Sequence, residues 1–141
     1  MAVDRRERSA PFGSAGATIP TGPLAPTAAR DYLTRWLEDH VSETDLDDAL
    51  LLISELVTNS VRHADTLVGA PLSITAQLTG DVLRLEVGDT GRGGGVARRT
   101  PHPHGGGFGL NIVDGLAARW GVEHRGGTQV WCELLRQTLP G

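Results

Sequence analysis

The sequence predicts an α+β fold in which helices cover one face of an antiparallel or mixed sheet. Two stretches with apolar residues at helical spacing come first, and the strands follow as two hairpins with a short helix between them. Strands joined in a hairpin need no crossover connection. The helices are therefore expected to gather on one side of the sheet.

The chain of 141 residues is expected to form one compact domain. Residues 1–16 are rich in Pro, Gly, Ala and Ser, which predicts a flexible N-terminal arm, and residues 17–138 are expected to form the domain. Residues 17–20 also fit an edge strand. Only 4% of the residues are aromatic, so the core is expected to be mainly aliphatic.

Charge and cysteine content exclude several classes of protein. The formal net charge of -4 argues against direct binding of nucleic acid, which requires a basic face. Cys132 is the only cysteine, so no internal disulfide is expected, and its position in a strand predicts a buried, inert thiol. The arginines near the start precede no apolar run, and no stretch is long enough to span a bilayer. We expect a cytoplasmic protein without membrane contact.

Two helices are expected in the first half of the domain. Residues 27–40 place Leu33, Trp36 and Leu37 at helical spacing after the start signal Pro26. The second helix is expected to begin between Ser42 and Asp45, where capping and acidic residues suit a helix N-terminus, and to continue to Ala64.

The second half is expected to contain two hairpins and one helix. Residues 72–78 and 82–87 alternate apolar and polar across a short turn, and residues 88–109 form a glycine-rich loop. A third helix is expected over residues 110–118, with Gly121 as its stop signal. Residues 122–124 and 129–135 predict the final hairpin.

The second helix carries the strongest candidate for chemistry. Glu55 and Asn59 are four residues apart and share one side, with Arg62 and His63 about one turn further on. Spacing alone fits a solvated helix face better, because most polar helix faces are exposed to water. The opposite side is apolar, which lets the helix pack on a sheet: Leu50, Ile53, Val57, Val61 and Ala64.

Two glycine-rich turns add to this helix. Asp89 ends a strand and enters a turn with Gly91 and Gly93, where a carboxylate can accept a hydrogen bond from an exocyclic amine and glycines allow close approach of a ligand. The segment 105–110, GGGFGL, leads into a helix whose free N–H groups favour a phosphate. Each turn by itself also fits a plain flexible loop.

In this order, the Glu-x-x-x-Asn helix and the two glycine-rich turns resemble the N, G1 and G2 boxes of the GHKL ATPases. Their fold, called the Bergerat fold, is a two-layer α/β sandwich with a glycine-rich ATP lid. The resemblance covers residues 17–135. Residues 55–64, ELVTNSVRHA, resemble the branch of anti-sigma factor serine-protein kinases.

The resemblance implies ATP and Mg²⁺ as cofactors. It implies that Asn59 binds the Mg²⁺ that bridges the phosphates, that Asp89 binds the adenine amino group, and that Glu55 is the general base. The resemblance also implies that Gly91 and Gly93 shape the adenine pocket and that Thr128 supports Asp89 there. It implies that the backbone of Gly107, Phe108, Gly109 and Leu110 binds the phosphates. Arg62 and His63 are implied in an assisting role.

The resemblance also implies a function in transcription regulation. Members of this branch bind a sigma factor and phosphorylate a serine on an anti-anti-sigma protein of the STAS type, and the family implies a homodimer. Two alternatives stay open: a non-catalytic nucleotide-binding anti-sigma module that acts by sequestration, and a simple ATPase without a protein acceptor. Glu55 favours the kinase.

Overall fold

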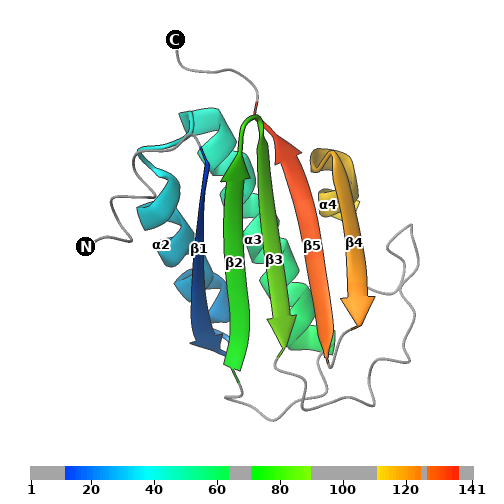
Figure 1. Ribbon diagram of the computed structural model, residues 1–141. Coiled ribbons are helices and arrows are strands. Elements are labelled where there is room, and N and C mark those ends of the chain that lie inside the picture. Colours follow the sequence, from blue (N-terminus) through cyan, green and yellow to red (C-terminus); the bar gives the residue numbers. More distant parts are fainter. Residues whose placement is uncertain (1–11, 64–70, 90–110, 125–126, 137–141) are drawn as a thin grey trace.

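The computed structural model describes residues 12–63, 71–89, 111–124 and 127–136 (Figure 1). They form a five-stranded sheet in the order β1-β2-β3-β5-β4, and every pairing between these strands is antiparallel. Of the two predicted sheet types, the described strands form the antiparallel one. In chain order the elements are β1 (Phe12–Pro20), α2 (Ala25–Leu37), α3 (Glu43–His63), β2 (Pro71–Thr79), β3 (Val82–Asp89), α4 (Asn111–Leu116), β4 (Arg119–His124) and β5 (Thr128–Leu135).

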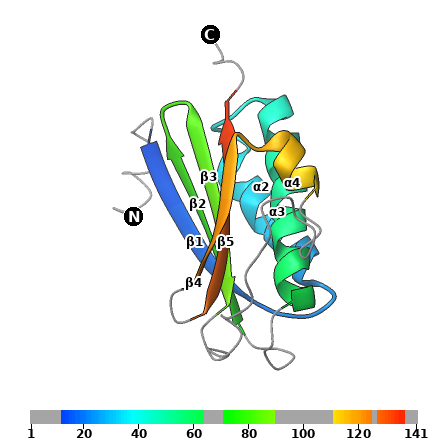
Figure 2. The ribbon, with the colours of Figure 1, turned by 90° about the vertical axis from the view of Figure 1, so that its right-hand side faces the viewer.

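The described helices lie on one face of the sheet, as the hairpin order predicts (Figure 2). Alternate residues of each central strand point into this layer, because side chains of a strand alternate between the two faces. In β2 these are Leu72, Ile74, Ala76 and Leu78, all buried. The helices contribute Leu33 and Leu37 from α2 and five residues from α3: Ala49, Leu52, Ile53, Leu56 and Val57.

This core is aliphatic and includes the single cysteine. Cys132 in β5 is fully buried, and burial raises the pKa of its thiol to about 12. The thiolate, which is the reactive form, is therefore suppressed at neutral pH. The prediction of a buried thiol is confirmed.

The start of α3 follows from its capping residue. The Ser42 hydroxyl oxygen accepts a hydrogen bond from the backbone N–H of Asp45 at 3.1 Å, and the Ser42 carbonyl accepts one from Leu46. This is the arrangement expected of an N-cap serine. On the apolar side of α3, Ile53 and Val57 are fully buried, whereas Leu50 and Val61 are only partly buried.

The first helix lies earlier in the chain than the spacing predicts, at residues 25–37 instead of 27–40. It starts at Ala25, which places Pro26 in the first turn. Backbone N–H groups there have no partner within the helix, so proline, which lacks an N–H, is tolerated. It stops at Leu37, whose carbonyl accepts hydrogen bonds from both His40 and Val41. The His40 ring also donates to the Trp36 carbonyl at 3.0 Å.

The first strand extends into the segment expected to be a flexible arm. Residues 12–16 belong to β1, and the pairing with β2 runs continuously from Phe12 opposite Thr79 to Pro20 opposite Pro71. The prediction was wrong for these residues because backbone hydrogen bonds, and not apolar side chains, define this edge strand. Amino-acid composition does not predict this backbone pairing between strands.

Gly121 does not end the third helix. The helix α4 ends at Leu116, and Gly121 lies inside β4 opposite Trp131. A Cβ atom on Gly121 would lie 2.9 Å from the Trp131 ring, so the glycine makes room for the indole of the neighbouring strand. A glycine in a strand commonly marks such a close approach.

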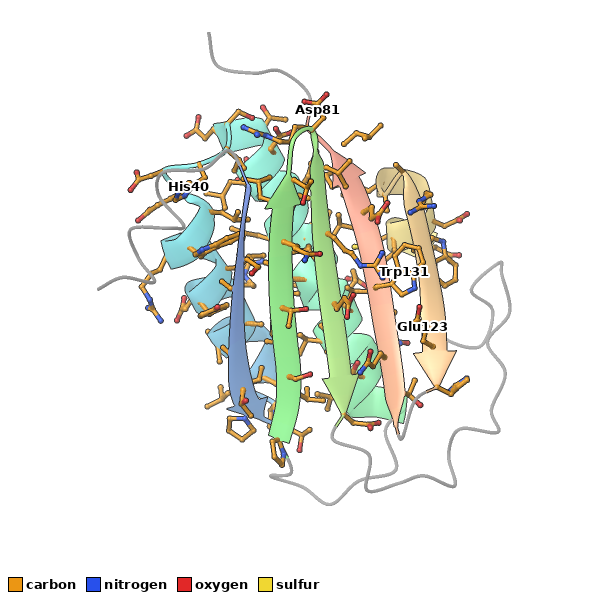
Figure 3. All side chains as sticks on the ribbon, in the orientation of Figure 1. His40, Asp81, Glu123 and Trp131 are labelled. Atoms are coloured by element: carbon orange, nitrogen blue, oxygen red, sulfur yellow. The ribbon has the colours of Figure 1, made fainter. Side chains whose placement is uncertain are left out.

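The face of the sheet away from the helices carries a network of charged side chains. Arg84 contacts Glu86 at 2.8 Å and Glu133 at 2.9 Å, and its guanidinium lies 4.1 Å from the centre of the Trp131 ring. Arg119 pairs with the other oxygen of Glu133 at 2.8 Å. Trp131, labelled in Figure 3, thus lies on this open face, where it packs against arginines instead of the core.

Candidate nucleotide-binding site

The C-terminal half of α3 brings two of the candidate residues to one end of the sheet. Figure 1 shows this half of α3 beside the region where β3 ends and β5 begins, and α3 packs against both strands. Glu55 and Asn59 are one helical turn apart, so their side chains are neighbours. Glu55 is half-buried, and Asn59 is buried with 4% of its surface exposed.

The buried Asn59 side chain leaves an oxygen unused. Its Oδ1 atom has no hydrogen-bond partner among the described residues. The other buried side-chain atoms without a partner in the described part of the chain are N–H donors, on Trp36 and Arg136, so Asn59 supplies the one acceptor. An unsatisfied buried polar group costs stability, typically about 1–3 kcal/mol, and a native case calls for an explanation such as an absent ligand or ion.

Asp89 and Thr128 meet across the sheet at the same end. Asp89 is the last residue of β3 and Thr128 the first of β5, and the Thr128 backbone N–H donates to Asp89 Oδ1 at 3.3 Å. Both follow the alternation of buried residues in their strands, which places their side chains on the helix-covered face. This bond orients one carboxylate oxygen and leaves Asp89 half-exposed.

The backbone before Asp89 is supported from the open face. Gly88 is buried, and a Cβ atom there would lie 2.8 Å from Cγ of Gln129, so only glycine lets the Gln129 side chain cover the strand. The Ser73 hydroxyl donates to the Gly88 carbonyl at 3.4 Å. The strand that presents Asp89 is thus held by its neighbours on both sides.

The remaining candidate residues fall wholly or partly outside the described residues. Arg62 and His63 lie in the last turn of α3, and their side chains are not described. Six residues of the two glycine-rich turns also lie outside the described ranges: Gly91, Gly93, Gly107, Phe108, Gly109 and Leu110. The structure therefore brings together Glu55 and Asn59 on the helix and Asp89 and Thr128 on the sheet.

Two further residues bear on this region and are not among the sequence-based candidates. Ser73 supports Gly88, and the His124 ring nitrogen Nδ1 lies 3.4 Å from the Thr128 hydroxyl oxygen. His124 lies opposite Thr128 in the register of β4 and β5, and the sequence does not specify this register. Ser73 likewise lies directly opposite Gly88 in the register of β2 and β3.

The donor set at this end suits a metal held jointly with a ligand better than a metal held by protein alone. Among the described residues no group of three or more His, Cys, Asp or Glu side chains is arranged to hold a metal ion. Mg²⁺ usually binds one or two protein oxygens together with substrate phosphates. The unpartnered oxygen of Asn59 fits that role.

Comparisons with known proteins agree with this architecture. Residues 20–134 match the histidine kinase-like ATPase domain. The fold is similar to a crystal structure of the RsbU and RsbW domains of Rv1364c from Mycobacterium tuberculosis, with a TM-score of 0.68 and 24% identity. The match covers 87% of this chain and 32% of that chain, so this chain spans about a third of that protein. Comparison with curated proteins gives no match.

An antiparallel sheet with helices on one face, and a polar helix edge beside the ends of β3 and β5, define an ATPase domain of the GHKL type. The chain belongs to the histidine kinase-like ATPase domain family. No described helix combines the length and apolarity needed to cross a membrane.

Proposed function

We propose that this chain binds ATP together with Mg²⁺ at the end of the sheet formed by β3 and β5. The observation that carries the proposal is the buried Asn59 side chain, whose oxygen has no partner among the described residues. A protein that keeps an unsatisfied acceptor in this position gains from a ligand that satisfies it. Asp89, held by Thr128, supplies a carboxylate for the adenine amino group.

Within this site, Asn59 would hold Mg²⁺ through Oδ1, alongside the phosphate oxygens. When bound, the ion supplies positive charge that offsets the charge of the transferring phosphoryl group. The glycine-rich segment Gly107 to Leu110, with backbone N–H groups leading into α4, would bind the phosphates, and Gly91 and Gly93 would shape the adenine pocket. Arg62 and His63 would assist from the last turn of α3.

Phosphate transfer to a protein serine is the proposed reaction, with Glu55 as the general base. The Glu55 carboxylate would accept the proton of the serine hydroxyl while the serine oxygen bonds to the γ-phosphorus and the bond to the ADP leaving group breaks. No described residue hydrogen-bonds to this carboxylate.

The proposed biological role is that of an anti-sigma factor in the cytoplasm. In this role the chain would bind a sigma factor and phosphorylate a serine on an anti-anti-sigma protein of the STAS type, as a homodimer. Support comes from residues 55–64, which resemble that branch, and from the similar fold of a structure that contains an RsbW domain. The domain proposed for this activity comprises β1 and the rest of the chain to about residue 138.

Calorimetric titration tests the nucleotide site. We expect MgATP to bind to the wild type, and Asp89→Asn to weaken binding by about 10- to 100-fold, because a hydrogen bond to a charged group contributes about 1.5–3 kcal/mol. Asp81→Asn is the matched control, since Asp81 is an exposed turn residue at the opposite end of the sheet (Figure 3). No binding by the wild type would refute the proposal.

Phosphate transfer is tested separately with γ-labelled ATP and a STAS-type protein as acceptor. Label on an acceptor serine supports the kinase. ATP binding without transfer, together with inhibition of a sigma factor, would instead support the module that acts by sequestration. Release of labelled phosphate without any labelled acceptor would indicate a simple ATPase.

A further inference from the structure

The Thr128 hydroxyl belongs to the proposed nucleotide site, and it has a histidine partner. Thr128 donates its backbone N–H to Asp89 Oδ1, so the residue that carries this hydroxyl contacts the carboxylate proposed to bind the adenine amino group. The same hydroxyl oxygen lies 3.4 Å from Nδ1 of His124, the residue directly opposite it on β4. His124, Thr128 and Asp89 thus form a chain of contacts across three strands.

The direction of the His124–Thr128 hydrogen bond depends on the imidazole proton. When Nδ1 carries no proton, it accepts, and the Thr128 hydroxyl must donate to it. When Nδ1 is protonated, as it always is in the imidazolium, it donates, and the Thr128 oxygen accepts. The hydroxyl proton is then free to point toward another acceptor.

The state of this hydroxyl matters to a purine held by Asp89. A carboxylate that binds the adenine amino group leaves the neighbouring ring nitrogens, which are acceptors, in need of a donor. Thr128 offers such a donor only when its own proton is not used by His124. A protonated His124 therefore favours adenine binding, and a His124 that accepts through Nδ1 disfavours it.

The charged groups around His124 are few among the described residues. Asp89 of β3 lies beyond Thr128, and Asp114 of α4 is bonded to Trp120, which shares the face of β4 with His124. Glu123 precedes His124 and points to the other face of β4. His124 itself is exposed to solvent.

We propose that His124 is a positioning residue of the nucleotide site, which sets through Thr128 whether the hydroxyl beside Asp89 donates or accepts a hydrogen bond at the purine. This inference rests on the proposed ATP site. It gives His124 a role that neither the ATP-binding motifs nor the family match assigns, and it makes adenine affinity higher when Nδ1 of His124 carries a proton than when Nδ1 accepts a hydrogen bond.

The test is the Kd for MgATP between about pH 8 and pH 6, where histidine changes charge. Five proteins are compared: the wild type, His124→Leu, Thr128→Val, Thr128→Ser, and the double variant with His124→Leu and Thr128→Val. For each protein, the quantity compared is the ratio of the Kd at the higher pH to the Kd at the lower pH. We expect this ratio to be about two- to tenfold larger for the wild type than for His124→Leu, which corresponds to one neutral hydrogen bond. Protonation of the ATP phosphates is common to all five proteins and cancels in this comparison.

Thr128→Val keeps the backbone N–H to Asp89 and is expected to lose the same pH-dependent component, whereas Thr128→Ser is expected to retain it. Adding His124→Leu to Thr128→Val should then change nothing further, because the pair acts as a unit. A pH profile of His124→Leu that matches the wild type, or equal effects of His124→Leu with and without the Thr128 hydroxyl, would overturn the inference while leaving the ATP site intact. Absence of ATP binding by the wild type at every pH would overturn both.

Discussion

The open face of the sheet and the end that carries Asn59 use polar groups in opposite ways. On the open face, Arg84 contacts two carboxylates and Trp131, and Arg119 occupies the second oxygen of Glu133. At the site, Asn59 Oδ1 is buried without a partner among the described residues, and Glu55 has no hydrogen bond from them. The more exposed groups are the better paired.

We propose that this difference separates groups that serve the fold from groups available to a ligand. A charge network on a sheet surface satisfies its own members and needs no ligand, and it covers the aromatic ring of Trp131. A buried acceptor without a partner lowers stability unless something binds to it. Substitutions in the two regions should therefore have opposite consequences for stability and for function.

The largest effect is expected for Glu55→Gln. Loss of the proposed general base should slow phosphate transfer by about 10²- to 10⁴-fold, while MgATP affinity and the melting temperature stay near the wild type. Single-turnover transfer from labelled ATP to the acceptor measures the rate. Glu38→Gln, at the exposed C-terminal end of α2, is the control and should transfer at the wild-type rate. Undiminished transfer by Glu55→Gln would assign the base to another group.

Asn59→Leu should separate stability from binding. Replacing an unsatisfied buried acceptor by an apolar side chain of similar size should leave the free energy of unfolding unchanged or raise it by about 1 kcal/mol, whereas MgATP affinity should fall by about tenfold or more. Urea unfolding without nucleotide and calorimetric titration measure the two quantities.

Gln77→Leu is the matched amide replacement for Asn59→Leu, because Gln77 is exposed on the open face of β2. It should leave MgATP affinity unaltered. A large loss of stability in Asn59→Leu would mean that Asn59 serves the fold and would remove the main support for the site.

Arg84→Met should show the reverse pattern. The substitution removes the pairs with Glu86 and Glu133 and the contact with Trp131 but keeps an unbranched apolar stem. We expect a loss of about 1–2 kcal/mol in the free energy of unfolding, since each such interaction contributes about 0.5–1 kcal/mol, and an unchanged Kd for MgATP. A change in Kd without a change in stability would contradict the division between the two regions.

The smallest effect is expected from the titration of Glu133. Partial burial raises the pKa of this carboxyl, but hydrogen bonds from Arg119 and Arg84 outweigh burial and lower it below its ordinary value of 4.5. A carboxyl with a lowered pKa in the folded state stabilises the protein above its ordinary pKa, and that contribution is lost as pH falls through the folded value. Wild-type stability should therefore fall below about pH 4.5.

Glu133→Gln should lose less stability over the same pH range, because Gln does not titrate. Urea midpoints at successive pH values between about 6 and 3 measure the slopes. Glu38→Gln again serves as the control and should follow the wild type. Parallel slopes for the wild type and Glu133→Gln would show that the network contributes nothing to the pH dependence.

Local signals in the sequence predicted α3 and its start well. Ser42 caps the helix as expected, and the apolar spacing that includes Ile53 and Val57 faces the core. The central hairpin also followed from its alternating pattern, with Leu72 and Leu83 buried on the helix-covered face. These features depend on neighbours within a turn or two of the chain, which the sequence contains directly.

Predictions that depended on distant neighbours were less successful. Gly121 was expected to end a helix but makes room for Trp131 of the next strand, and residues 12–16 were expected in an arm but pair with β2. The pairing of His124 with Thr128 was not foreseen as part of the site. In each case the deciding contact joins two strands, and composition does not specify the register between them.

By itself, the sequence determined which helix carries the Glu-x-x-x-Asn pair and which strand ends in Asp89, because helical and strand spacing are properties of adjacent residues. Only the tertiary structure decided that the oxygen of Asn59 is buried without a partner in the described part of the chain, and that Thr128 orients Asp89. Burial and hydrogen-bond partners are set by which segments pack together, so they become defined only when the helix layer and the sheet meet.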